Sequence, residues 1–351
     1  MPTQTALWLP KEFGQYELAT RDIGKPGPDE VLVKLMATAV NPLDWKIQEI
    51  GYFMIKDYPA VLGFEGAGIV EDVGENVIEH VKGDEVFFSG FMTNRHSTFQ
   101  QYVIVLAVHA AKAYQAASIP VGLATAVDAL YSPKPHGFAF TPPWEEGGRG
   151  KYKDRSIVVL GGASAVGQFG KLSNELAPSF FIQVARLSGF SPIITTASLH
   201  NTTLLTSLGA THVVDRHLPL SSLAQEVAKV TSTPTNLVFD AVATSETQQA
   251  GYDLLVSGGQ IAVALPPTIQ TKLEDDKQVL KMWGSFYPPE KREFGTRMYS
   301  QLTRMFAEAE LVPLPVEVLP DGLNGIVAGL ERLKNNLISG KKLIAHPWDT
   351  A

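Results

Sequence analysis

The chain has 351 residues, of which 45% are hydrophobic and 19% charged, a balance typical of a folded protein. At roughly 150 residues per domain, this length predicts two domains. The formal net charge of -7 offers no general attraction to nucleic acid or to an anionic membrane, and the absence of cysteine excludes disulfides, thiol nucleophiles and cysteine-bound zinc.

The N-terminus shows neither a basic start followed by an apolar stretch nor a membrane anchor. The most apolar run, residues 102–111, is too short for a bilayer, which takes about 20 residues, and indicates a buried strand or core segment. We therefore expect a cytoplasmic protein without a membrane partner.

Short apolar runs separated by glycine and proline fill the N-terminal third and predict a β-rich domain: VLVKLMATAV, GFEGAGIVEDVG, KGDEVFFSG and TFQQYVIVLA. Residues 132–153 are rich in proline, glycine and charge, and predict a connecting loop.

From Ser156 onward, β-branched runs alternate with stretches long enough for helices: SIVVLGG, PIITTA, HVVD, LVFDAV and QIAVAL. This alternation predicts an α/β fold with a doubly wound parallel sheet. Further along we expect a helix over 294–310, a strand over 316–319, an amphipathic helix over 323–337 and a last strand in GKKLIAHP.

A glycine-rich turn follows the first strand of this region. It consists of Gly161, Gly162, Ala163, Ser164, Ala165, Val166 and Gly167. A turn between a strand and a helix directs backbone N–H groups and the positive end of the helix at a pyrophosphate. Ser164 replaces the middle glycine of the dinucleotide fingerprint, so a tight turn without a ligand stays open as an alternative.

The next strand is followed by Ser198, Leu199, His200 and Asn201, with no carboxylate for the ribose hydroxyls of NAD. Small donors and a histidine suit a ribose 2′-phosphate, so NADPH is favoured over NADH. Alternatively, Ser198 and Asn201 cap the following helix, and the two roles can coexist.

These motifs, together with NPLDWK near the N-terminus and SGKKLIAHP near the C-terminus, resemble the quinone-reductase and enoyl-reductase branch of the medium-chain dehydrogenase/reductases. The resemblance is strongest to fungal zinc-independent members, the trans-acting polyketide enoyl reductases and ToxD-like proteins. It implies a GroES-like catalytic domain over 1–124 and 290–351, wrapped around a Rossmann NADPH-binding domain over 125–289, with the substrate in a cleft between them.

In zinc-containing relatives, a Gly-His-Glu motif and a cysteine bind the catalytic metal. Here the motif is Gly63, Phe64 and Glu65, and the cysteine position falls near residues 41–44, where no thiol exists. We therefore expect no metal, and we interpret Glu65 as a buried acid that holds a turn by hydrogen bonds.

The resemblance also assigns cofactor contacts. Residues 161–167 would take the pyrophosphate, and Ser198, His200 and Asn201 the 2′-phosphate. Arg216 stands where many relatives have a tyrosine near the adenosine, and its charge suits a phosphate. The remaining contacts are expected from Asp44, Trp45, Lys46, Thr125, Ala241 and Leu265, the last three beside the nicotinamide half.

We expect an NADPH-dependent oxidoreductase that passes hydride to an enone, enal, quinone or acyl thioester. Tyr52 follows Asn41 by the same interval as the acid-acting tyrosine of similar mitochondrial-type enoyl thioester reductases. It is the candidate proton donor, and an aromatic at the pocket rim is the alternative.

The sequence leaves three questions open, on the substrate, on the oligomeric state and on catalysis itself. The substrate is either a free small molecule or an acyl chain carried by a polyketide synthase. Relatives often pair through an edge strand of the nucleotide-binding domain, and MWGSFY, residues 282–287, is the candidate for a homodimer. A non-catalytic NADPH-binding protein is the third reading, because fold does not fix function.

Residues 170–181 look like extra material between the turn and the segment IQVARLSG. They are either a natural extension or translated intronic sequence. Proline inside a helix removes a hydrogen bond, so we expect the helix after the turn to be interrupted near Pro178.

Overall fold

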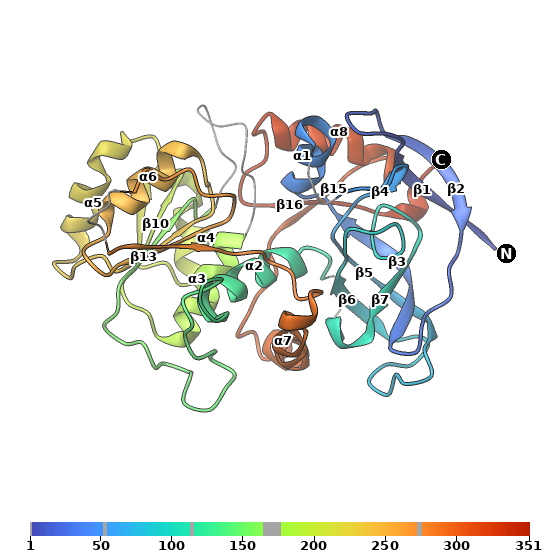
Figure 1. The fold of residues 1–351 in the computed structure, drawn as a ribbon, viewed down its shortest axis with the longest axis horizontal. Coiled ribbons are helices and arrows are strands. Elements are labelled where there is room, and N and C mark those ends of the chain that lie inside the picture. The colour runs from blue at the N-terminus through green and yellow to red at the C-terminus, as the bar shows by residue number, and fades with distance from the viewer. Residues whose placement is uncertain (1, 52–54, 113–115, 164–176, 272–275) are drawn as a thin grey trace. The chain divides into compact units, whose positions relative to one another are not determined.

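The computed structural model describes residues 2–51, 55–112, 116–163, 177–271 and 276–351. The chain divides into two compact units (Figure 1). The first comprises Met1–Val121, Phe286–Ala309 and Pro313–Ala351, and the second comprises Gly122–Ser285 and Glu310–Val312. The first unit is therefore assembled from three separate stretches of chain.

The first unit is rich in strands. Its elements are β1 (Thr3–Leu9), β2 (Glu17–Asp22), β3 (Glu30–Ala39), α1 (Pro42–Ile50), β4 (Ala60–Val61), β5 (Glu65–Val73), β6 (Glu85–Ser89), β7 (Tyr102–Leu106), β8 (Ala110–Lys112), α7 (Pro289–Ala307), β15 (Val316–Val318), α8 (Gly322–Lys334) and β16 (Lys342–Ala345). Two short 3₁₀ turns, Ala107–His109 and Pro347–Asp349, complete it.

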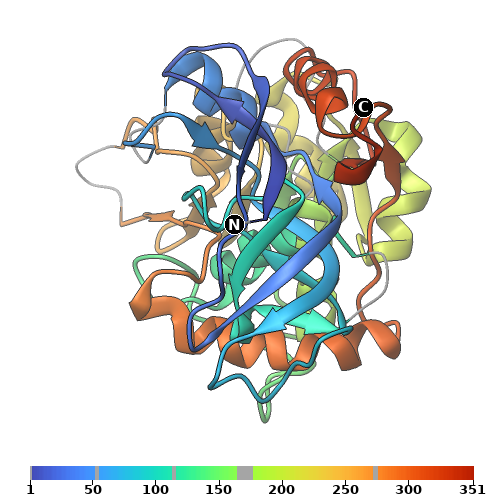
Figure 2. The same ribbon diagram turned by 90° about the vertical axis from the view of Figure 1, so that its right-hand side faces the viewer.

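A mixed sheet dominates this unit, with strand order β15-β16-β3-β5-β6-β8 and with β7 paired to β3. A smaller sheet has the order β2-β1-β4. Figure 2 shows helix α7, in orange, beneath the blue and cyan strands, where it packs against β8. The strand-rich character predicted for the N-terminal third is confirmed, and residues 102–112 form β7, a 3₁₀ turn and β8.

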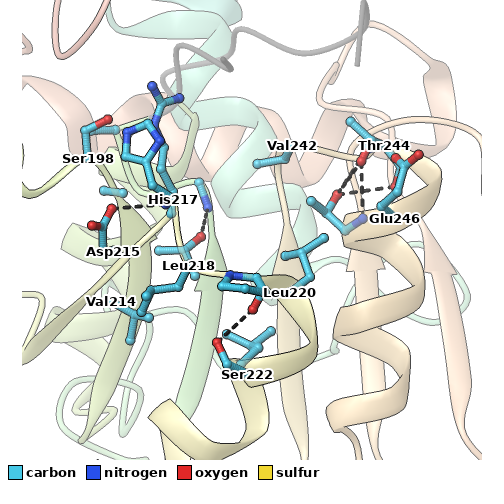
Figure 3. Close-up of a pocket in the computed structure, with 18 residues that line it drawn as sticks. Ser198, Val214, Asp215, His217, Leu218, Leu220, Ser222, Val242, Thr244 and Glu246 are labelled. Carbon is cyan, nitrogen blue, oxygen red and sulfur yellow. Dashed lines mark hydrogen bonds between the residues drawn. The ribbon is translucent and has the colours of Figure 1, made fainter. Parts of the chain in front are cut away.

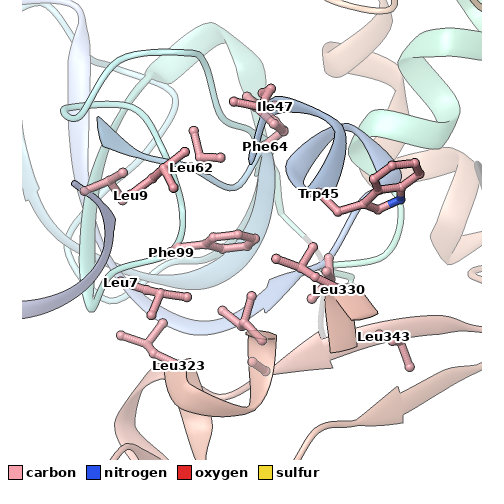
Figure 4. Close-up of a cluster of buried hydrophobic side chains, with 14 of the residues drawn as sticks. Leu7, Leu9, Trp45, Ile47, Leu62, Phe64, Phe99, Leu323, Leu330 and Leu343 are labelled. Carbon is pink, nitrogen blue, oxygen red and sulfur yellow. The ribbon is translucent and has the colours of Figure 1, made fainter. Parts of the chain in front are cut away.

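An apolar core fills the space where β1, α1 and α8 meet (Figure 4). It includes Leu7 and Leu9 from β1, Ile47 from α1 and Leu323 from α8, none of them more than 1% exposed. This core anchors α1 on one side, and it also contains Phe64, which is 6% exposed.

The second unit is built on a parallel sheet. Its elements are β9 (Ile157–Leu160), α3 (Ala177–Ser188), β10 (Ile193–Ala197), α4 (Thr202–Leu208), β11 (His212–Asp215), α5 (Leu223–Val230), β12 (Leu237–Asp240), α6 (Ser245–Leu254), β13 (Gln260–Val263) and β14 (Gln278–Lys281), with 3₁₀ turns at Leu199–Asn201 and Leu220–Ser222. Helix α2 (Pro120–Tyr131) begins in the first unit and continues into the second.

The six strands run in the order β11-β10-β9-β12-β13-β14, and every neighbouring pair is parallel. Chain order reverses between β9 and β12, which is the point where doubly wound sheets bind ligands. All four residues of β9 and of β12 are buried, as expected for strands covered on both faces. The predicted doubly wound α/β fold is confirmed.

Helices cover both faces of this sheet (Figure 1). Leu223 and Val227 of α5 and Tyr252 of α6 join a core cluster on one face. On the other face, Phe181 of α3 stacks on Phe239 of β12, with ring centroids 4.3 Å apart. Both faces of the sheet are thereby packed against apolar side chains of helices.

Several predicted elements keep their type but change their bounds. The helix expected over 294–310 is α7, which begins five residues earlier at Pro289, and residues 132–153 contain no helix or strand, as predicted for a loop. The edge strand predicted at 282–287 is wrong, because the edge strand is β14, Gln278–Lys281, and the chain leaves the sheet after it.

The interruption predicted near Pro178 falls largely outside the described residues, because helix α3 is described from Ala177 onward. Proline is tolerated in the first turn of a helix. Phe180 and Phe181, which we had counted as extra material, are fully buried in the sheet's helical cover.

Candidate functional site

A pocket of about 440 Å³ opens at the carboxyl ends of β9, β10, β11 and β12 (Figure 3). Every lining residue belongs to the second unit. Its walls are formed by Gly161, Ala163, Thr196, Ala197, Ser198, Val214, Asp215, Arg216, His217, Leu218, Pro219, Leu220, Ser222, Leu223, Val242, Thr244, Glu246 and Thr247. Ligands of doubly wound sheets bind at this position.

The first residues of the glycine-rich turn line this pocket. Gly161 has a φ of 90°, a left-handed conformation that favours glycine, and its N–H donates to Thr196 Oγ1 at 2.9 Å. A Cβ atom on Gly162 would lie 2.2 Å from Thr195 Oγ1, so any larger residue would force this turn away from β10. Ala163 lines the pocket, and the predicted phosphate contacts Ser164, Ala165, Val166 and Gly167 lie outside the described residues.

The segment after β10 contributes one of its three predicted contacts to the wall. Ser198 lines the pocket and is 7% exposed, whereas His200 and Asn201 are not among the described lining residues. Neither Ser198 nor Asn201 makes a side-chain capping hydrogen bond, so the capping alternative does not account for them.

The end of β11 supplies the charged part of the pocket. The Arg216 N–H donates to the carbonyl of Ala197 at 3.0 Å, which places the arginine beside the end of β10. Burial lowers the pKa of the Arg216 guanidinium, and Asp215 acts in the opposite direction. Asp215 Oδ1 accepts the N–H of His217 at 3.0 Å, and Figure 3 shows His217 with Ser198 on one side of the pocket.

Asp215 and His217 did not stand out in the sequence. The signal was available, because HVVD is a strand and parallel strands end at the same edge of a sheet. Any residue directly after β11 therefore had to lie near the residues that follow β10.

The turn after β12 forms the opposite wall and is organised by Asp240, which is fully buried. Its Oδ1 accepts the N–H groups of Val242 and Ala243, both at 2.9 Å, and its Oδ2 accepts the Thr247 hydroxyl at 2.8 Å. These bonds hold Ala243 at a φ of 54°, a strained value for a residue with a side chain. Asp240 thereby presents Val242 and Thr244 to the pocket.

Three other predicted contacts of the second unit are not among the described residues that line this pocket. Ala241, directly after β12, is fully buried, and Leu265, two residues after β13, is half-buried. Thr125 of α2 is buried, and a Cβ atom on Gly284 would approach its Oγ1 to 2.3 Å. Their assignment to the nicotinamide half therefore stays a prediction.

The α1 segment of the first unit contains three more predicted contacts, Asp44, Trp45 and Lys46, and all are 5% exposed or less. Asp44 Oδ2 accepts the N–H of Asn41 at 2.8 Å and its Oδ1 accepts the N–H of Gly63 at 3.1 Å. Burial raises the pKa of Asp44 to about 7, against the opposing effect of those two N–H groups and of Lys342. Asp44 thus fixes the helix start.

Trp45 and Lys46, the next two residues of α1, are both buried. The Trp45 Nε1 atom is buried and has no hydrogen-bond partner among the described residues. A buried donor of this kind usually finds a partner, so this atom fits a group that binds beside α1.

Glu65 is the centre of a buried polar network. It is fully buried, its Oε1 accepts the Asn41 Nδ2 at 2.9 Å, and its Oε2 accepts the N–H of Val121 at 2.8 Å. The predicted hydrogen-bonding role of Glu65 is confirmed. Glu65 also forms an ion pair with Lys342, whose Nζ lies 2.6 Å from Oε1, and the sequence does not predict this pair.

The residues at the zinc-relative positions do not fit a catalytic zinc. Phe64 has no donor atom, and Figure 4 draws it among the aliphatic side chains of the core. The neighbouring carboxylate of Glu65 is engaged by an ammonium, which disfavours a divalent cation beside it. Within the described ranges, there is no group of three or more His, Asp or Glu placed to hold a metal ion.

The candidate proton donor Tyr52 lies outside the described residues. Its neighbour Tyr58 is partly buried, and burial raises the pKa of its hydroxyl. The identity of the proton donor therefore stays a prediction.

A doubly wound sheet with a pocket at its carboxyl edge, joined to a strand-rich unit, defines a dinucleotide-binding α/β protein of two parts. A family model described as the alcohol dehydrogenase GroES-like domain matches residues 27–115, and one described as zinc-binding dehydrogenase matches residues 179–300. Together these matches span more than half of the chain.

Curated relatives cover almost the whole chain. A trans-enoyl reductase of Penicillium oxalicum is 28% identical over 91% of this chain and 90% of its own length. A dehydrogenase of Emericella nidulans is 29% identical over 98% of this chain and 99% of its own length.

Solved structures share the fold at lower identity. The quinone oxidoreductase of Coxiella burnetii is 19% identical with a TM-score of 0.69, covering 98% of this chain and 99% of its own. The CurK enoyl reductase is 18% identical with a TM-score of 0.74 over 98% of this chain and 99% of its own.

The chain belongs to the medium-chain dehydrogenase/reductase family of nicotinamide-dependent oxidoreductases. The resemblance read from its motifs is thereby confirmed. Among the helices of the described residues, none has the length and apolarity needed to cross a membrane.

Proposed function

We propose that the protein is an NADPH-dependent reductase that transfers hydride to an activated C=C bond, a quinone or a carbonyl without zinc. The observation that carries this proposal is the pairing of Ser198 and Arg216 on one pocket wall, with no carboxylate in the segment that follows β10. A cation and a small hydroxyl suit a ribose 2′-phosphate.

The chain's own residues would bind and orient the cofactor. The turn at Gly161 and Gly162 lets a pyrophosphate approach the backbone, and Leu218, Leu220 and Leu223 offer an apolar surface to an adenine. A bound NADPH would supply the hydride, and hydrogen-bond donors at the substrate oxygen would stabilise the charge that develops there. Tyr52 is our proposed donor of the final proton.

Zinc independence is supported by the side chains at the zinc-relative positions. Phe64 belongs to an apolar core, and the nearest carboxylate, Glu65, is held by Asn41, Val121 and Lys342. We expect activity to survive exhaustive treatment with a chelator, and loss of activity that zinc restores would contradict this part of the proposal.

The cofactor preference can be tested at Arg216. Purified protein should oxidise NADPH in the presence of an enone, enal or quinone, with NADH much poorer. Arg216→Gln should weaken NADPH binding by roughly 10- to 100-fold, the value of a charge-assisted hydrogen bond of about 1.5–3 kcal/mol, and should leave NADH binding nearly unchanged.

The matched control is Arg149→Gln, which removes an exposed ion pair with Glu310 in the same unit. Its NADPH affinity should equal that of the wild type. Equal efficiency of the wild type with both cofactors, or an Arg216→Gln variant that keeps its preference, would remove the argument for NADPH.

A second candidate function is enoyl reduction in trans, on acyl chains carried by a polyketide synthase. It is favoured by the relatives named trans-enoyl reductase, whose full length this chain nearly covers. We expect turnover of an enoyl thioester on an acyl carrier protein to exceed that of the same acyl group on free pantetheine. Equal turnover on both would favour a reductase that acts alone.

A further inference from the structure

A second cavity lies in the first unit, where β2 meets the segment between β6 and β7. Its volume is about 240 Å³, and all of its described lining residues belong to the first unit. It shares no described lining residue with the pocket of the second unit. A ligand in this cavity would therefore be recognised by residues that the cofactor pocket does not use.

Arg21 of β2 supplies a positive charge to this cavity. Its Nη1 donates to the carbonyl of Asn94 and, at 3.0 Å, to Gln100 Oε1, and its guanidinium lies 5.6 Å from the centroid of the Trp8 ring. All three partners are neutral, and Arg21 forms no ion pair with the described residues. Among those residues only Nη1 has an acceptor, so the Nε and Nη2 donors of the planar fork are left for a ligand.

The neighbouring charges do not neutralise Arg21. Arg95 also lines the cavity, and its own guanidinium is paired with Glu30. Asp22 is exposed, and successive side chains of a strand point to opposite faces of the sheet. Burial lowers the pKa of the Arg21 guanidinium, and Asp22 has the smaller, opposing effect. Arg21 is thus a partly desolvated cation to which no described carboxylate is bonded.

Apolar side chains form much of the rest of the wall. Leu32 and Ile104 are 8% and 3% exposed, and Ile23 and Tyr102 are half-buried. Gly24 keeps the cavity open, because a Cβ atom there would lie only 3.0 Å from Ile104 Cδ1. A cation beside apolar walls suits a small molecule that has one anionic end and an apolar body.

We propose that this cavity binds a small carboxylic acid with an apolar body, whose carboxylate accepts two parallel hydrogen bonds from Nε and Nη2 of Arg21. The planar fork of arginine matches the two oxygens of a carboxylate in this way. The cavity of about 240 Å³ is smaller than the pockets of about 300–1,000 Å³ that hold drug-sized ligands, so benzoate is a suitable probe. This binding needs no nucleotide and goes beyond the proposed function.

The test measures binding of benzoate to the full chain by calorimetry. Benzamide, which has the same ring without the charge, and inorganic phosphate, which has the charge without the ring, should both bind much more weakly. Arg21→Gln should weaken benzoate binding roughly tenfold or more, because the charge-assisted pair is lost. Circular dichroism checks that the variant is folded.

Arg21→Lys keeps the test decisive if Arg21→Gln does not fold. A lysine retains the charge but not the fork, so benzoate should bind more weakly than to the wild type and more tightly than to Arg21→Gln.

Two matched controls remove a positive charge elsewhere. Arg304→Gln breaks an exposed pair with Glu308 in the same unit, and Arg216→Gln removes the cation of the second unit's pocket. Both variants should bind benzoate as the wild type does.

Three results would overturn the proposal. The first is a wild type that does not bind benzoate, or that binds benzamide or phosphate equally well. The second is unchanged benzoate affinity in the Arg21 variants. The third is loss of binding in Arg216→Gln, which would assign benzoate to the pocket of the second unit.

Discussion

Asp240 shows how one buried side chain shapes the cofactor pocket. It does not line the pocket itself, yet its three hydrogen bonds set the turn that places Val242 and Thr244 on the wall. Burial raises the pKa of Asp240 to about 6, against the opposing effect of the hydrogen bonds from Ala243, Thr247 and Val242. The contribution of Asp240 to folding stability therefore depends on pH.

The sign of that dependence follows from the raised pKa. The ordinary pKa of this carboxyl is 3.8, so its contribution to stability is fully present below about pH 4 and is lost as the pH rises through about 6. Asp240→Asn stays neutral. Its free energy of unfolding, relative to the wild type, should rise between about pH 4 and pH 7 by up to roughly 3 kcal/mol.

Urea unfolding at several pH values measures this difference. Asp253→Asn, at an exposed position of helix α6 in the same unit, serves as the control and should track the wild type across the range. A pH-independent difference between Asp240→Asn and the wild type would contradict the raised pKa.

Tyr52 is the residue whose role can be decided by kinetics. If it donates the proton, Tyr52→Phe should lower kcat with enones by roughly 10²-fold, the lower end of what general acid catalysis contributes. Tyr58→Phe, the neighbouring tyrosine, should have little effect on kcat. An unchanged kcat in Tyr52→Phe would show that Tyr52 does not donate the proton and would favour a packing role for its side chain.

Single residues were predictable from the sequence where a strand ends and a turn begins. Gly161 and Ser198 were found this way and Arg216 through the family resemblance, and all three line the pocket. The Glu65–Lys342 pair was not predictable, because 276 intervening residues separate two charges that nothing in the local sequence connects. The same holds for Asp240, whose hydrogen bonds to its own turn are not visible as a motif.

Among the elements, helix α3 packs aromatic side chains against the parallel sheet of the second unit. Phe180 and Phe181 are fully buried, and the second of them stacks on Phe239 at an interplanar angle of 4°. Residues that looked like an insertion thus belong in part to the packed core of the second unit.

Phe181→Ala should therefore cost about 3–5 kcal/mol of folding stability, the usual cost of removing a buried aromatic ring. Chemical denaturation measures this loss. Leu199→Ala, at a position that is 54% exposed, should change stability by much less. A small effect of Phe181→Ala would show that the segment is dispensable.

Hydrophobic patterns predicted the type of these elements better than their ends. The five strands from SIVVLGG to QIAVAL are all present, and the two central ones, β9 and β12, are fully buried, as their continuous apolar runs predict. The aromatic segment MWGSFY, residues 282–287, does not form a strand. Its buried residues Phe286 and Tyr287 already belong to the first unit, so their apolar character reflects a different core.

At the scale of the whole molecule, β14 leaves an edge of the parallel sheet without a neighbouring strand among the described residues. A sheet edge without a neighbouring strand is a natural place for a second chain to pair. We predict a homodimer through this edge, with a mass in light scattering of twice 38.1 kDa.

Trp283 follows β14 and is 43% exposed, so it tests this arrangement. Trp283→Glu should shift the protein toward the monomer at low concentration, because a charge in an apolar contact must be desolvated. Trp348→Glu, at a similarly exposed tryptophan of the first unit, is the control. A wild type that is monomeric at all concentrations would contradict the prediction.

The network around Glu65 also constrains the order in which the chain can fold. Asn41 and Lys342 are 301 positions apart, so the carboxylate at the centre has no ammonium to balance it until almost the entire chain has been synthesised. Contacts of such long sequence separation form late. In a nascent chain that ends before β16, Glu65 has no ammonium partner, and we expect its carboxylate to stay hydrated. The core around Glu65 is therefore expected to close only when β16 joins the first unit.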